Sequence, residues 1–140
     1  QLFFSKMNNY FKEGGSSGNG TTILNFNSET VFPFQVVDII NSSSMSSLRI
    51  MRNSMKEINS KYPRKDKGTI FGSIKSGVHP NATHYFVSGY LSYGDLLEAD
   101  RKYRLENPEV IEDAMKLWKD IDWSTSKSLR KFTRVLVKKW

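Results

Sequence analysis

The stretch from residue 31 to Pro63 constrains the fold most, because its hydrophobic pattern changes from that of a strand to that of a helix at a run of serines. Residues 31–40 are rich in β-branched and aromatic side chains and predict a strand, with Pro33 at the strand's start or at a sheet edge. Residues 41–44 then offer helix N-caps, and apolar residues recur every three or four positions until Pro63 ends the helix. A strand followed directly by a four-turn amphipathic helix indicates a sheet with a helix packed on it.

The remaining patterns extend this α+β prediction. Strands are expected at residues 22–26, 68–74 and 83–91, with a turn at residues 76–81. Asn107, Pro108 and Glu109 form a favourable helix opening, and apolar residues follow on one face to residue 121. The last stretch, 126–140, is ambiguous; we expect it to be helical at its start and extended at its end. The predicted fold is a small, mostly antiparallel sheet packed against two or three amphipathic helices, with an extended N-terminal arm.

The 140 residues are enough for one globular domain, which we expect at residues 23–140. Residues 13–22 hold four glycines and no apolar side chain, so they predict a flexible linker. Residues 1–12 then form an apolar docking arm. Its Leu2, Phe3 and Phe4 predict docking on the protein's own core or self-association with a neighbouring copy.

Charge and composition narrow the function classes. Twenty-one Lys and Arg against fourteen Asp and Glu give a net charge of +7, which favours polyanionic partners such as RNA or an acidic lipid surface. There is no cysteine, which excludes thiolate chemistry and sulfur-containing zinc sites, and only two histidines are present. We therefore expect no metal site and no cofactor.

Basic residues gather in two segments of the chain, separated by an acidic one at residues 95–122. We predict that these two segments bind polyanions without sequence preference, since neither carries a base-reading motif. In the first segment the helical spacing of three and four places basic side chains on one stripe, and in the second a similar spacing is present. The candidate residues are Arg49, Arg52, Lys56, Lys61, Arg64, Lys65 and Lys67 in the first segment and Lys127, Arg130, Lys131, Arg134 and Lys138 in the second.

The two histidines suggest an alternative, enzymatic hypothesis. His79 and His84 flank a predicted turn, and with Lys75 and Ser73 they could serve as the acid and base of a metal-independent ribonuclease. That reaction requires the two rings on opposite sides of a phosphate. The simpler interpretation is that both are ordinary surface residues.

Three segments resemble rhabdovirus matrix proteins: residues 47–60, a helix with the sequence SLRIMRNSMKEINS; residues 74–77, IKSG; and residues 114–121, AMKLWKDI. The resemblance implies a non-enzymatic assembly protein, with no small-molecule substrate, that joins a ribonucleoprotein to an anionic membrane and contacts other copies of itself. It implies location in the virion and in the host cytoplasm or at the inner membrane face. The alternatives are a small ribonuclease toxin domain and a sequence-tolerant nucleic-acid-binding protein, either cytoplasmic or secreted.

Overall fold

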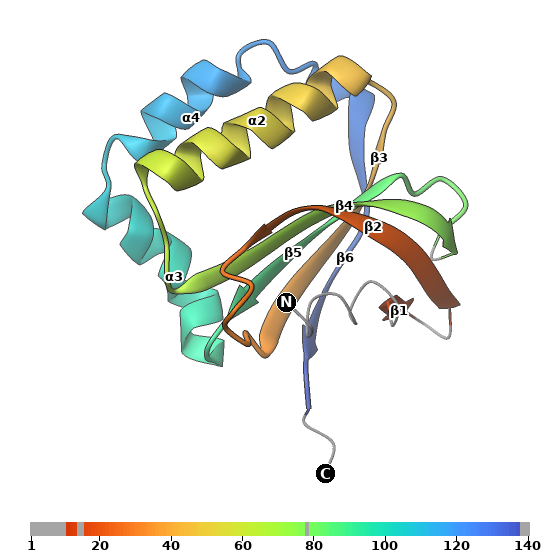
Figure 1. Ribbon diagram of the computed structural model, residues 1–140, viewed down its shortest axis with the longest axis horizontal. Coiled ribbons are helices and arrows are strands. Elements are labelled where there is room, and N and C mark those ends of the chain that lie inside the picture. Colours follow the sequence, from red (N-terminus) through yellow and green to blue (C-terminus); the bar gives the residue numbers. More distant parts are fainter. Residues whose placement is uncertain (1–10, 14–15, 78, 138–140) are drawn as a thin grey trace.

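The computed structural model describes residues 11–13, 16–77 and 79–137, which form an antiparallel sheet with three helices on one side (Figure 1). The strand order is β1-β2-β4-β5-β3-β6, and every neighbouring pair is antiparallel. The predicted α+β class is therefore confirmed. The strands are β1 (Phe11–Glu13), β2 (Ser16–Phe26), β3 (Phe34–Ser42), β4 (Lys67–Gly77), β5 (His84–Tyr90) and β6 (Ser126–Val135), and the helices are α2 (Met45–Lys61), α3 (Tyr93–Glu106) and α4 (Val110–Trp118).

The transition from β3 to α2 follows the prediction. Pro33 immediately precedes β3, and the Ser44 hydroxyl caps α2 by accepting a hydrogen bond from the Ser47 backbone N–H at 3.1 Å. The helix ends at Lys61, two residues before Pro63. Its buried residues include Leu48 and Met51, and Leu48 lies on the side that faces the sheet.

The two faces of the sheet have different cores. A cluster on the face away from the helices contains Phe32, Val37, Ile39, Ile70, Tyr85 and Val87, all nearly inaccessible to solvent. Glycines make room for the two rings in this cluster. A Cβ on Gly72 would lie 2.5 Å from the Tyr85 ring, and a Cβ on Gly68 would lie 2.6 Å from the Phe32 ring.

The predicted linker is wrong in its second half. Strand β2 begins at Ser16 and pairs with β4 from Gly18 onward. Gly20 lies where a Cβ would collide with the Ser73 carbonyl oxygen and come within 3.1 Å of the Tyr85 ring. At this position glycine serves close packing within the sheet, and composition alone does not distinguish that from a flexible linker.

The helical start expected for residues 126–140 is also wrong, because β6 is extended from Ser126 onward and pairs with β3. The misleading signal comes from a register shift: Ile39 pairs with Arg130, whereas Ile40 pairs with Ser128. The extra residue between them, Leu129, lies three positions before Phe132, a spacing that imitates a helix. A β-bulge therefore produced the ambiguity.

Helix α3 has no counterpart in the sequence prediction. Ala99 is its one buried residue, and Tyr93, Leu97 and Leu105 are exposed, so the helix lacks the apolar stripe that periodicity detects. The predictions for Leu2, Phe3, Phe4 and Lys138 lie outside the described residues. Within the described part of the chain, no helix has the length and hydrophobicity needed to cross a membrane.

Candidate functional site

A cleft of about 360 Å³ lies between the first half of α2 and the sheet, and it brings together residues that are distant in the sequence. Arg49 and Arg52 come from α2, and His84 is the first residue of β5. The remaining lining is apolar: Ile23, Met45, Leu48 and Phe71. Two arginines and a histidine on an apolar floor form a site suited to an anion with an aromatic or apolar portion.

His84 is held in a fixed orientation inside this cleft. Its ring stacks on Phe71, with centroids 5.5 Å apart and planes 13° apart, and Phe71 itself is 1% exposed. Its Nδ1 shares a hydrogen bond of 2.9 Å with the Thr83 hydroxyl, which leaves Nε2 as the nitrogen available to a ligand. Burial lowers the pKa of His84 below its usual 6.5, so the ring is neutral at pH 7 in the free protein.

Apart from Lys61 at its end, the basic residues of α2 have no carboxylate partner among the described residues. Arg49, Arg52 and Lys56 are exposed, and none of them takes part in an ion pair there. They follow one another at spacings of three and four, as the sequence predicts for a stripe on one side of the helix. Their charges are available to an external anion.

Two other basic residues of the first segment, Arg64 and Lys67, have carboxylate partners within the protein. Arg64 contacts Asp66 and Asp100 at 2.9 and 2.7 Å, and its guanidinium lies 4.2 Å from the centre of the Tyr103 ring. The Lys67 ammonium lies 3.2 Å from Asp100. With side chains only 13% and 18% exposed, Arg64 and Lys67 hold α3 against the sheet. Arg64 and Lys67 are therefore engaged in contacts within the protein, whereas polyanion binding was expected to use them on a free surface.

Asp100 is the centre of this charged group. Besides the two cations, it accepts a hydrogen bond of 2.9 Å from the Tyr90 hydroxyl. Burial raises the pKa of Asp100, but the charge of Lys67 and the hydrogen bonds from Arg64 and Tyr90 outweigh burial and hold it below its usual 3.8. Burial also lowers the pKa of Lys67. The carboxylate therefore remains charged throughout the neutral range.

Lys61 and Lys65 differ from one another. Lys61 forms an ion pair with Asp113 of α4 at 2.6 Å, an interaction that joins the end of α2 to α4. The same carboxylate accepts a hydrogen bond from the Tyr62 hydroxyl. Lys65 is exposed and takes part in no ion pair among the described residues. Of these two, Lys65 is the one that can extend the basic surface of α2.

The second basic segment does not form the helical stripe that its spacing suggested. Along β6 the side chains alternate between the two faces of the sheet, so Arg130 and Arg134 share one face and Lys131 points to the other. The Arg134 Nε donates to the Gln35 side-chain oxygen at 3.0 Å, and burial lowers the pKa of Arg134. Lys127, Arg130 and Lys131 are exposed on an edge strand, where cations also discourage pairing with another sheet.

The candidates for ribonuclease chemistry do not all meet in the cleft. Ser73 is the cross-strand partner of His84, and Lys75 is exposed two residues further along β4. His79 lies in the turn between β4 and β5, where its Nδ1 accepts a hydrogen bond from the Asn81 backbone N–H. Among the described residues that line the cleft, His84 is the only histidine.

No protein-family model and no curated protein matches this chain. The site is therefore characterised by its own geometry. Within residues 11–13, 16–77 and 79–137, no cluster of three or more His, Asp or Glu side chains is placed to hold a metal ion. Anion binding through arginine is the chemistry that the cleft offers.

Sequence reasoning found the arginines and the histidine but not their proximity. Arg49 and His84 are separated by a helix end, a loop and a complete strand. The pairing of β5 with both β3 and β4 brings His84 beneath α2. Sequence reasoning also missed Asp100, whose role as acceptor for Arg64, Lys67 and Tyr90 depends on the unpredicted helix α3.

Proposed function

We propose that the protein is a non-enzymatic, polyanion-binding assembly protein, and that the cleft between α2 and the sheet is its RNA-binding site. The observation that carries this proposal is the convergence of Arg49, Arg52 and His84 on one cleft. Lys56 continues the same basic surface along α2. Arg49, Arg52 and Lys56 have no carboxylate partner among the described residues.

RNA fits this cleft better than a simple anion does. An arginine guanidinium can donate two hydrogen bonds to one phosphate, and an aromatic ring with a face open to a cleft offers a stacking surface for a nucleobase. The His84 ring, supported from behind by Phe71, provides such a surface. Stacking and phosphate contacts do not distinguish one base from another, so binding is expected to tolerate many sequences.

The wider role follows from the resemblance to rhabdovirus matrix proteins. It would place the protein between a ribonucleoprotein and an anionic membrane, in the virion and at the inner face of the host membrane. The exposed Lys127, Arg130 and Lys131 on β6 offer a second cationic surface for that arrangement. Self-association would involve Leu2, Phe3 and Phe4 of the N-terminal segment.

The test is charge reversal on α2. The variant carrying Arg49→Glu and Arg52→Glu should lose at least tenfold in affinity for a fluorescent single-stranded RNA in an anisotropy titration, since two phosphate contacts become repulsive. A matched control carries Lys102→Glu and Lys119→Glu, two exposed residues of α3 and of the segment after α4, and has the same net charge. Equal losses of affinity in both variants would show that only net charge matters and would contradict the assignment of the cleft as the RNA site.

The same RNA tests the ribonuclease alternative. The position of His84 beside two arginines is compatible with that alternative. Gel electrophoresis after incubation without added metal should show intact RNA. Cleavage that disappears in His84→Ala would replace the assembly role with a catalytic one, because loss of a general acid or base lowers a rate by roughly 10² to 10⁴.

A further inference from the structure

A second cavity, of about 330 Å³, lies on the helix side of the sheet between α2, α3 and α4. Its volume is at the lower end of the range for small-molecule sites, about 300–1,000 Å³. Most of its wall is apolar, formed by Phe26, Met55, Ile58, Val110, Ile111, Ala114 and Trp118. This cavity shares no lining residue with the cleft lined by Arg49 and His84.

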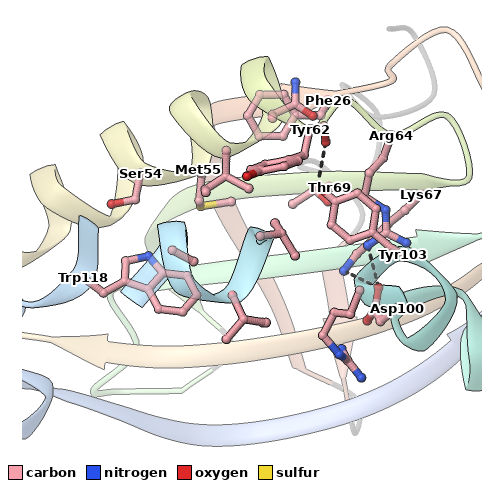
Figure 2. A pocket seen from close by; sticks show the side chains of 16 residues that line it. Phe26, Ser54, Met55, Tyr62, Arg64, Lys67, Thr69, Asp100, Tyr103 and Trp118 are labelled. Carbon is pink, nitrogen blue, oxygen red and sulfur yellow. Dashed lines mark hydrogen bonds and ion pairs between the residues drawn. The ribbon is translucent and has the colours of Figure 1, made fainter. Parts of the chain in front are cut away.

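The polarity of this cavity changes from one end to the other. Figure 2 shows Trp118 at one end and the group of Arg64, Lys67, Asp100 and Tyr103 at the other. Met55 lies between them, on α2. An occupant that matches this lining has an apolar body and a polar group at one end.

The charges at the polar end favour an anion. Three cations line the cavity, Arg64, Lys67 and Arg104, against one carboxylate, Asp100, so the lining carries a net charge of +2. Asp66, which neutralises part of Arg64, lowers this to +1. Arg104 is exposed and forms no ion pair within the described residues. An anionic group in the cavity would therefore find an exposed guanidinium with no carboxylate partner among the described residues.

Lys67 strengthens the preference for an anion. Its side chain is only 18% exposed, and its one carboxylate contact, Asp100, is shared with Arg64. Burial without a carboxylate of its own is unfavourable for an ammonium group, and the lowered pKa of Lys67 reflects that cost. A second anionic group nearby would stabilise the charged form.

We propose that this cavity binds a single-chain anionic amphiphile, with its alkyl chain directed toward Trp118 and its carboxylate or phosphate between Lys67 and Arg104. A water molecule takes up about 30 Å³ in the liquid, and a methylene group is of similar size, so the volume accommodates about ten methylenes. That length corresponds to a medium-chain acyl group. The ligand class is thus defined by one flexible chain and one negative charge.

Trp118 provides a direct reporter of chain insertion. In the full chain carrying Trp123→Phe and Trp140→Phe, Trp118 is the one remaining tryptophan. Titration with a dodecanoic acid brominated near its methyl end, below its micelle concentration, should quench Trp118 fluorescence in a saturable manner, because bromine quenches only on contact. Unbrominated dodecanoate or dodecyl phosphate should reverse the quenching, and comparison of the two identifies the preferred head group. Quenching that does not saturate, or that dodecyl maltoside reverses as well as the anions do, would overturn the proposal.

The head-group position is tested on α3. Arg104→Glu should weaken the brominated acid at least fivefold, whereas Lys102→Glu should leave its affinity within twofold, because Lys102 is exposed on the same helix but does not line the cavity. Both variants change the net charge equally and alter exposed positions. Equal weakening by the two would show adsorption driven by net charge and would contradict the site.

The chain position is tested from α4. Ala114→Leu adds three carbons to the wall and should abolish saturable quenching while circular dichroism still reports a folded protein. If this variant does not fold, Ile111→Gln provides the second test, since Ile111 is 46% exposed and lines the same cavity. It should weaken binding at least threefold, and unchanged affinity would contradict the proposed chain path.

Discussion

At the residue scale, His84 makes a prediction about pH. Burial lowers its folded pKa below 6.5, so the folded state binds fewer protons than the unfolded chain, and stability is lost as the pH falls from 6.5 through the folded pKa. In the free protein Arg49 and Arg52 face the same cleft and oppose protonation of His84. A bound phosphate has the opposite effect, because its negative charge stabilises the protonated ring. RNA affinity should therefore increase about fivefold between pH 7.5 and 5.5, an effect of ~1 kcal/mol.

The matched variant for this measurement is His84→Asn, which retains a polar side chain but cannot titrate. Its affinity for RNA should change less than twofold over the same pH range. An unchanged pH profile in the variant would assign the titration to another group and remove His84 from the site.

Asp100 makes a second prediction at this scale. Asp100→Asn removes the charge that Arg64 and Lys67 share, and we expect the free energy of unfolding to fall by about 1–3 kcal/mol, less than for a fully buried pair because Asp100 is partly exposed. Urea denaturation measures the change. Glu98→Gln is the control: it removes an exposed carboxylate paired with Arg101 on the same helix and should cost under about 0.5 kcal/mol. A loss no larger than that of the control would show that the charged group contributes little to stability.

At the scale of elements, two glycines in different surroundings give opposite expectations. Gly72→Ala would place a Cβ against the Tyr85 ring and the Thr21 carbonyl oxygen, so it should destabilise the protein by roughly 1–3 kcal/mol. Gly94→Ala lies in the first turn of α3, where the nearest atom is 3.7 Å away, and should be neutral or stabilising by up to about 1 kcal/mol. Thermal unfolding of both variants distinguishes them, and equal effects would contradict the packing described for Tyr85.

The individual elements also show which parts of the fold can be predicted from the sequence. Strand β3 and helix α2 were predictable, because a β-rich run, a serine cap and a proline stop are local signals. Helix α3 was not, because the contacts of Asp100 with Arg64 and Tyr90 hold it in place without an apolar stripe. The start of β6 was misread because the bulge at Leu129 depends on its partner strand.

The candidate site divides in the same way. The stripe of Arg49, Arg52 and Lys56 follows from helical spacing, which depends only on neighbours in the chain. The placement of His84 beside that stripe depends on the pairing of β4 with β5, and so does its stacking on Phe71. Asp66, one partner of Arg64, is a neighbour in the chain, but Asp100, the carboxylate that Arg64 and Lys67 share, comes from the unpredicted helix α3.

At the scale of the whole molecule, the assembly role predicts two separable functions. Deletion of residues 1–10 removes Leu2, Phe3 and Phe4, and we expect the remaining chain to bind RNA with unchanged affinity but to form fewer multimers on it. Sedimentation of protein with RNA measures the assembly, and thermal unfolding of the free protein provides the control. A large fall in melting temperature would show that the segment supports the protein's own core instead of contacting a neighbour.

The central claim, that α2 and His84 form the polyanion site, is tested most directly by the salt dependence of RNA affinity. Each phosphate neutralised on a single strand contributes about −0.7 to the slope of log affinity against log salt. Replacing Arg49, Arg52 and Lys56 with glutamine should therefore reduce the magnitude of that slope by roughly 2, whereas glutamine at Lys102, Lys116 and Lys119 should leave it unchanged. An unaltered slope in the first variant, or an equal change in both, would contradict the assignment.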